Sequence, residues 1–359
     1  MNVSANSALV YNAVIIGGVM KQLLFTLLVL IITACSNAPE PQIFHISGAT
    51  MGTGYNVRWV ASADQSEAVK TQVDERLAEI NRVMSTYDPQ SELSLLNQRR
   101  DTPFRQTVSA DLAEVLGLSL MLNQHSGGLF DVTVGPLVNL WGFGPADDVT
   151  MAPSDEDINL ALEQTGADAI RLDGAVLSLQ SPRYIDLSAI AKGWGVDEVA
   201  QLLESLGHRH YLVEIGGEIR VSGAKPGDIP WRIAIERPQQ SLQQQAQLIL
   251  EPGNRAVATS GDYRNFFVAD GVRYSHTISP LSGKPVEHSL ASVSVIHESA
   301  ALADGWATAL TVAGPQQAMA LAMEHQLAVY MIIRGESDYH SQASPLFKTW
   351  FPSVAAEIH

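Results

Sequence analysis

Segments with strand periodicity and segments with helix periodicity are interspersed along the chain, without a strict βαβ rhythm. Apolar side chains alternate at Tyr55, Val57 and Trp59, and they recur at helical spacing from Val69 to Met84. This order predicts an α/β protein of the mixed (α+β) kind. Further strands are expected over residues 211–215, 231–236, 256–260, 291–297 and 327–333, and further helices over residues 110–125, 194–206, 300–312 and 315–325.

The composition excludes several classes of protein. The 359 residues include 22 Lys or Arg against 38 Asp or Glu, which gives a net charge of -16. Such an acidic chain is repelled by nucleic acid, so no nucleic-acid partner is expected, and any phosphate must be held locally by a metal or by backbone donors. The apolar share of 46% and the charged share of 17% exclude disorder, collagen and coiled coil for the whole chain.

The amino end has the layout of a secretory signal. Lys21 precedes the apolar run Leu23–Ile32, which small residues follow. The run is too short for the roughly 20 residues that cross a bilayer as a helix. Residues 1–34 are therefore predicted to be a cleaved signal peptide, with Met20 as a better start than Met1.

Cys35 is the chain's one cysteine, and residues 32–35 resemble a bacterial lipobox. A lipid anchor on Cys35 is predicted, with residues 35–42 as a tether. The alternatives are an ordinary buried cysteine or a plain signal peptide. The anchor implies a periplasm-facing lipoprotein of the bacterial cell envelope, and Ser36 favours the outer membrane over the inner one.

Three glycine-bearing segments, residues 126–128, 193–195 and 216–217, interrupt the apolar pattern. Each is predicted to be a turn, since none has the spacing of a dinucleotide-binding or Walker fingerprint. The first runs into residues 129–131, where backbone amides, an aromatic ring and a carboxylate together suit a flat heterocycle. Taken alone, Phe130 is expected in the core.

Asp304 and Thr308 are four residues apart in an alanine-rich helical segment, which places both oxygens on one helix face. Such oxygens are costly to bury unless something satisfies them. Oxygen ligands favour a hard cation, Mg²⁺ before Zn²⁺, and Mg²⁺ commonly combines one carboxylate with substrate phosphates. The alternative is a solvent-facing or backbone-bonded pair.

Two further segments hold residues that could act in catalysis or binding. Asp186 and Lys192 are six apart around a small apolar turn, where Lys192 could offset phosphate charge. The alternative is a helix start with Asp186 as its N-cap. His276 lies in a loop with Pro280 and Pro285, but as one of ten histidines it is by itself a weak candidate for catalysis.

Taken together, these segments resemble the ApbE family, the FAD:protein FMN transferases, also known as thiamine biosynthesis lipoproteins. The most specific segment is Gly128–Gly144, and the resemblance runs from about residue 43 to residue 350. The other matching segments are Met51–Thr53, Met84–Tyr87, Asp186–Asp197, Ile215–Glu218, Ser260–Tyr263, Ser275–Ile278 and Ala303–Thr308.

The resemblance implies a two-lobed fold with mixed sheets over residues 43–350, followed by a tail, residues 351–359, with FAD in the cleft between the lobes. It implies that His276 assists removal of the proton from an acceptor threonine. It also implies that Mg²⁺ is bound by Asp304, Thr308 and the main-chain carbonyl of Ala189. The residues that would hold FAD are Met51, Tyr87, Leu129, Phe130, Asp131, Asp186, Lys192 and Ile278.

The implied reaction is Mg²⁺-dependent transfer of FMN from FAD, as substrate, to a threonine hydroxyl of a flavoprotein, with release of AMP. Acceptors by family analogy are subunits of sodium-pumping quinone reductase or of the Rnf complex. An FAD pyrophosphatase and a non-catalytic flavin-binding lipoprotein are the alternatives. Family members commonly have Asp-Pro where this chain has Ser279-Pro280, which affects the loop near His276.

Overall fold

The computed structural model describes residues 39–99, 101, 103–144, 152–238, 246–261, 266–269, 272–336, 338–356 and 358. The predicted signal peptide, Cys35 and the matched residues Asp262 and Tyr263 lie outside the described residues. Chain contacts divide the protein into two units, of which residues 43–60 and 65–359 form the larger. In the part of the chain that is described, no helix has the length and hydrophobicity needed to cross a membrane.

The described elements, in chain order, are β1 (Gln42–Thr50), β2 (Thr53–Ala61), α2 (Ser66–Met84), α3 (Glu92–Asn97), β3 (Phe104–Thr107), α4 (Ala110–His125), α5 (Gly135–Leu140), α6 (Asp155–Leu162), η1 (Ala167–Ala169), β4 (Ile170–Asp173), β5 (Val176–Leu179), α7 (Ala191–Ser205), β6 (Tyr211–Ile215), β7 (Glu218–Ser222), β8 (Ala224–Lys225), β9 (Ile229–Pro230), β10 (Ile233–Glu236), β11 (Ala246–Leu250), β12 (Ala256–Gly261), β13 (Phe266–Ala269), β14 (Val272–Ser275), β15 (Leu290–His297), α8 (Ala300–Glu324), β16 (Ala328–Arg334), β17 (Tyr339–Ala343), α9 (Pro345–Trp350) and α10 (Pro352–Ala355).

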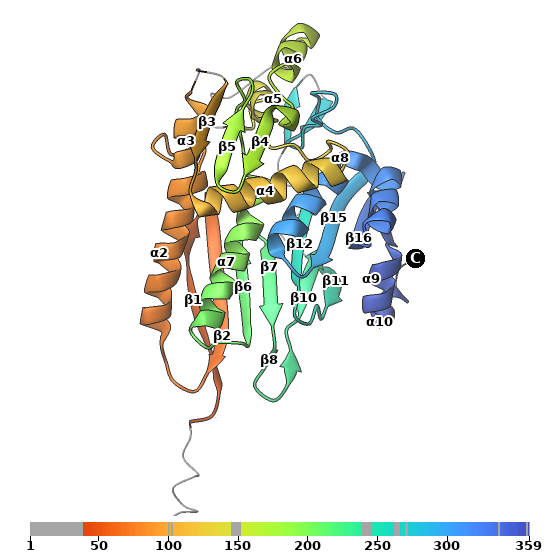
Figure 1. Cartoon of the computed structure of the whole chain (residues 1–359). Coiled ribbons are helices and arrows are strands. Elements are labelled where there is room, and N and C mark those ends of the chain that lie inside the picture. Colours follow the sequence, from red (N-terminus) through yellow and green to blue (C-terminus); the bar gives the residue numbers. More distant parts are fainter. Residues whose placement is uncertain are drawn as a thin grey trace, which may run out of the picture. The chain divides into compact units, whose positions relative to one another are not determined.

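An eight-stranded sheet in the order β1-β2-β6-β7-β12-β15-β16-β17 forms the centre of the larger unit (Figure 1). The pairings from β2 to β17 are antiparallel, with Val57 opposite Val213 and Val257 opposite Ile296. Helices and strands are combined in one fold, so the expected α/β (α+β) class is confirmed.

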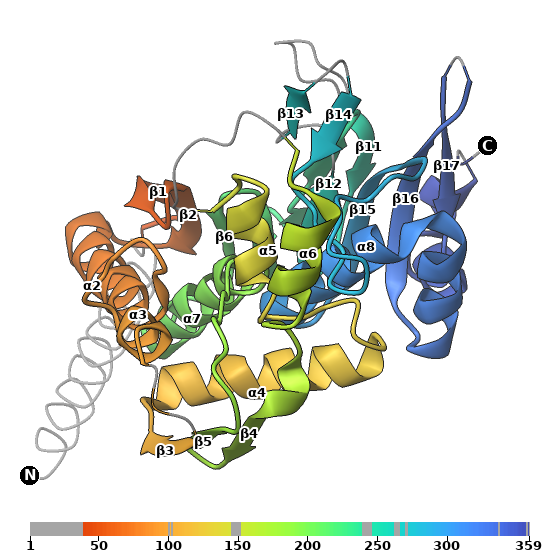
Figure 2. The ribbon, with the colours of Figure 1, turned by 90° about the horizontal axis from the view of Figure 1, so that it is seen from above.

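Helices α7 and α8 cover one face of this sheet. They contact each other as well as β6, β7, β12 and β15. Figure 2 shows α4 on the far side of these helices from the sheet, with the small antiparallel sheet β3-β5-β4 beyond it. The sheet and α7–α8 therefore form two inner layers, which α4 partly covers.

The opposite face of the sheet is covered where β15 and β16 lie. Tyr330 and Ile332 pack there with Leu250 of β11 and with Phe347 of α9. Because successive strand residues point to opposite faces, the alternate residues of β16 face α8 instead. Both strands are buried along almost their whole length, since both of their faces are covered.

The periodicity predictions for secondary structure are confirmed closely. Helix α4 spans residues 110–125, strand β6 spans residues 211–215, and the buried positions of α2 are the five apolar ones at helical spacing. The predicted helices 300–312 and 315–325 form one element, α8, which is interrupted at Gly314 with φ 73° and ψ 171°. Proline at position 315 explains the break, because it cannot donate to the preceding turn.

Helices α5 and α6 form a small cluster beside the main sheet. Leu137 of α5 and Trp141, which directly follows α5, pack with Ile158 of α6 and with Ile278. Trp141 Nε1 donates to the carbonyl of Gly283 at 2.8 Å, which ties α5 to the loop that follows β14. This cluster belongs to the larger unit.

Candidate active site

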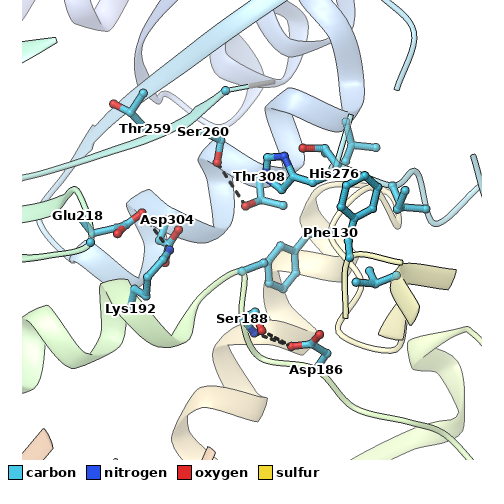
Figure 3. Close-up of a pocket in the computed structure, with 18 of the residues that line it drawn as sticks. Phe130, Asp186, Ser188, Lys192, Glu218, Thr259, Ser260, His276, Asp304 and Thr308 are labelled. Atoms are coloured by element: carbon cyan, nitrogen blue, oxygen red, sulfur yellow. Dashed lines mark hydrogen bonds and ion pairs between the residues drawn. The ribbon is translucent and has the colours of Figure 1, made fainter. Parts of the chain in front are cut away.

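A cavity of about 970 Å³ opens at the end of the main sheet where β6 leads into β7 and where β12 ends. Its size is in the range of cavities that bind large ligands. The predicted site residues that line it are Tyr87, Leu129, Phe130, Asp131, Asp186, Ala189, Lys192, His276, Ile278, Asp304 and Thr308. Figure 3 labels six of them: Phe130, Asp186, Lys192, His276, Asp304 and Thr308. The fold therefore brings together segments that are up to about 220 residues apart, as the spread from Tyr87 to Thr308 shows.

One side of the cavity, called the floor below, is formed where the N-terminal turns of α7 and α8 meet. A carboxylate from each helix accepts hydrogen bonds from the first N–H groups of the other helix. The Asp197 carboxylate of α7 accepts hydrogen bonds from the backbone N–H groups of Ala300 and Ala301, both at 3.0 Å. In return, Asp304 Oδ2 of α8 accepts from the N–H of Gly193 in the first turn of α7, at 3.0 Å. The first N–H groups of a helix lack partners within it and favour negative charge, so each carboxylate stabilises the neighbouring helix.

Lys192 lies between two buried carboxylates, as Figure 3 shows. Its Nζ is 3.0 Å from Glu218 Oε1 and 3.8 Å from Asp304 Oδ2. Burial alone would lower the pKa of Lys192, but the two carboxylates outweigh burial and raise it. Burial raises the pKa of Asp304, although the charge of Lys192 opposes this shift. Burial and the charge of Asp304 together raise the pKa of Glu218 to about 7.

The three residues predicted as metal ligands belong to the same cavity. Asp304, Thr308 and Ala189 all line the cavity, and Thr308 Oγ1 is 3.5 Å from Ser260 Oγ. Oxygen donors that include one buried carboxylate suit Mg²⁺, so the residues present fit the expected ion. No group of three His, Cys, Asp or Glu side chains arranged for a metal occurs among the described residues.

An apolar wall faces this charged floor. Phe130 is almost fully buried, as predicted for this residue taken alone. It nevertheless lines the cavity together with Leu129. At the rim, Tyr87 is 70% exposed although it is large and aromatic. A flat aromatic ligand could therefore lie against this wall while its polar end reaches the floor.

Asp131 and Asp186 line the cavity but bond mainly within the chain. Asp131 Oδ1 accepts from the N–H and the hydroxyl of Thr133, at 2.7 and 2.6 Å. Asp186 Oδ1 accepts from the N–H of Ser188 at 2.8 Å. The reading of Asp186 as an N-cap is wrong, because α7 begins only at Ala191.

His276 follows β14 directly and lines the cavity on the side opposite Lys192 (Figure 3). Its ring meets Phe143 edge-on, with centroids 6.3 Å apart. Its loop is closed by the N–H of Ser279, which donates to the carbonyl of Lys284 at 2.9 Å. The backbone therefore closes this loop, in which Ser279 precedes Pro280.

Met51 lies in the turn between β1 and β2, with φ 49°, rather than among the residues that line the cavity. Its methyl group approaches α7, where a Cβ added at Gly195 would be 2.9 Å from Met51 Cε. The turn predicted at residues 193–195 is wrong, since both of its glycines lie inside α7. The turns at 126–128 and 216–217 are present, and all four of their glycines have positive φ.

Glu218 lines the cavity but was not among the site residues predicted from the sequence. It begins β7, directly after the turn formed by Gly216 and Gly217. A carboxylate that follows a double-glycine turn at a strand end was the available signal. Its proximity to Lys192 depends on pairing between distant segments, and the linear pattern does not reveal such pairing.

The fold and the cavity define an α+β protein whose large cavity combines an apolar wall with buried charged side chains. The chain belongs to the ApbE family, whose model matches residues 51–331. It is 45% identical to an FAD:protein FMN transferase of Vibrio cholerae serotype O1 over 92% of this chain and 98% of that protein. It is 35% identical to the protein of the same name in Escherichia coli strain K12, over 90% of this chain and 95% of that one.

Solved structures agree with this assignment. The flavin transferase ApbE of Vibrio cholerae superposes with a TM-score of 0.80 at 44% identity, over 86% of this chain and 99% of that one. The apo form of the Pseudomonas stutzeri flavinyl transferase ApbE gives a TM-score of 0.81 at 38% identity, over 87% and 98% of the two chains. Both likenesses extend over nearly the whole length of the solved chains.

Proposed function

We propose that this protein transfers FMN from FAD to a threonine hydroxyl of an acceptor protein and releases AMP. The observation that carries the proposal is one cavity that combines the apolar wall at Phe130 with the oxygen ligands Asp304 and Thr308 and the cation Lys192. FAD has the matching parts, a flat flavin ring and a pyrophosphate. The similarity to named FAD:protein FMN transferases supports the same reading.

The reaction replaces one P–O bond with another. The threonine oxygen attacks the phosphorus of the FMN half, the bond from this phosphorus to the AMP phosphate oxygen breaks, and AMP leaves with that oxygen. A neutral hydroxyl is a poor nucleophile, so its proton must pass to a base. His276, on the cavity wall, is proposed to accept it.

Asp304, Thr308 and the Ala189 carbonyl are proposed to hold Mg²⁺. The ion would draw charge from the pyrophosphate as its P–O bond breaks. Lys192 would bind a pyrophosphate oxygen from the same floor. Leu129, Phe130, Tyr87 and Ile278 would hold the flavin, and Asp131 and Asp186 would shape the loops around it through their bonds within the chain.

The decisive experiment mixes the purified protein with FAD, Mg²⁺ and a candidate acceptor and searches for FMN attached to a threonine by mass spectrometry. An acceptor with valine in place of that threonine is the control. Rapid production of FMN and AMP without an acceptor would identify a pyrophosphatase instead. FAD binding without AMP release in any mixture would identify a non-catalytic flavin-binding lipoprotein.

The cellular setting is also part of the proposal. Lipidation of Cys35 would anchor the protein to a membrane and leave the catalytic unit facing the periplasm, with the outer membrane favoured. Subunits of sodium-pumping quinone reductase or Rnf complexes are proposed acceptors. These steps rest on the sequence at residues 20–36 and on the family resemblance.

A further inference from the structure

The carboxylate of Glu218 is only half satisfied. Its side chain is 7% exposed, and Oε1 accepts from Lys192 Nζ at 3.0 Å. Oε2 is buried and has no hydrogen-bond partner within the described ranges. A buried oxygen without a partner is costly, so a stable fold is not a sufficient reason for a glutamate at this position.

The surrounding charges show what Glu218 can do. Glu218 and Asp304 lie on either side of Lys192, at 3.0 and 3.8 Å from its Nζ. With both carboxylates ionised, the trio has a net charge of -1. A divalent cation on Asp304 would meet the Lys192 ammonium at short range, where little water screens their repulsion.

We propose that Glu218 is a positioning residue for the cation site, which holds the Lys192 ammonium away from Asp304 and offsets its charge. The closer contact of Lys192 is already with Glu218. When a divalent cation binds, Lys192 keeps this contact and gives up the longer one. Asp304 is then available to the ion, and Lys192 remains in the cavity to face an anion. The inference rests on the metal ligands of the proposed function.

The test measures the affinity for Mn²⁺ alone, without FAD, by electron paramagnetic resonance on the purified protein. In Glu218→Gln, the amide keeps the shape but loses the charge, and Lys192 turns to Asp304. We expect Mn²⁺ affinity to fall by at least about tenfold, because the lost charge lies in a poorly screened site. In Lys192→Gln, which removes the competing ammonium, Mn²⁺ affinity should rise.

The matched control is Glu214→Gln. Glu214 lines the same cavity, but its two oxygens accept from Gly217 N at 2.8 Å and from Asn56 Nδ2 at 2.7 Å, and glutamine keeps one acceptor. We expect its Mn²⁺ affinity to stay within about twofold of wild type, since this glutamate is more exposed and better screened.

FAD binding in EDTA separates positioning from general damage. Loss of a negative charge near the floor should leave FAD affinity unchanged or raise it, whereas a distorted cavity would weaken both ligands. The inference is overturned if wild type binds no Mn²⁺, if Glu218→Gln binds Mn²⁺ as wild type does, or if it loses FAD and Mn²⁺ alike. Failure of wild type to transfer FMN would refute the proposed function and leave the Mn²⁺ comparison intact.

Discussion

Substitution of Gly193 by alanine tests whether the close approach of α7 and α8 builds the cation site. A Cβ at this position would lie 2.3 Å from the carbonyl oxygen of Ala300 and 2.7 Å from Asp304 Cβ. Real Cβ atoms essentially never approach below 3.0 Å, so the two helices must separate by roughly 0.7 Å. The obstacle is backbone, which cannot rotate aside as a side-chain end can.

The expected cost follows from three contributions. Overpacking of a core contact costs about 1–3 kcal/mol. Weakening the bond from Gly193 N to the buried Asp304 carboxylate costs up to about 1.5–3 kcal/mol. The better helix propensity of alanine returns up to about 1 kcal/mol. With the full propensity gain subtracted, these lower the free energy of unfolding by about 1.5–5 kcal/mol.

The control is Gly117→Ala in α4, where the nearest atom would be 3.7 Å from the new Cβ. There only the propensity changes, so a gain of about 0.5–1 kcal/mol is expected. Urea unfolding followed by circular dichroism compares the two variants, and Mn²⁺ titration reports on Asp304. A Gly193→Ala protein as stable as wild type, with unchanged Mn²⁺ affinity, would refute the argument.

Four further predictions concern the proposed site and the anchor. Asp304→Asn keeps an acceptor for Gly193 N but removes the charge of the cation ligand, so FMN transfer should collapse while FAD binding partly survives. Thr308→Ala should have a milder effect, because water can replace a hydroxyl. FMN transfer measured across a Mg²⁺ titration compares the two variants. His276→Ala should lower transfer by about 100-fold to 10,000-fold with little change in FAD affinity; full activity would assign the base to another group. Because burial raises the pKa of Glu218 from 4.5 to about 7, its contribution to stability is full below pH 4.5 and is lost as pH rises through 7; urea unfolding in EDTA should show this slope in wild type and lose it in Glu218→Gln. Cys35→Ala should release the protein from the membrane fraction, and an unchanged fraction in cell lysates would contradict the lipid anchor.

Local patterns were sufficient for the long helices and for several strands of the main sheet. Side-chain periodicity is a short-range property, so the apolar spacing from Val69 to Met84 specified the buried face of α2 directly. The break at Gly314 was likewise readable, because a proline in the interior of a helical pattern interrupts the helix. The turn predicted from the glycines at 193 and 195 was wrong. These glycines lie in α7, where they allow close contact with Ala300 and Met51.

The sequence alone determined the α+β class, the long helices and several strands of the main sheet, and, through the family resemblance, all of the cavity residues it named except Met51. Only the tertiary structure showed that Asp304 caps α7, that Asp197 caps α8, and that Glu218 shares Lys192 with Asp304. The reason is physical. Helix and strand periods arise between residues a few positions apart, whereas the charges of this site interact across 26 and 112 positions of chain, and their energies depend on burial that exists only after the layers have packed.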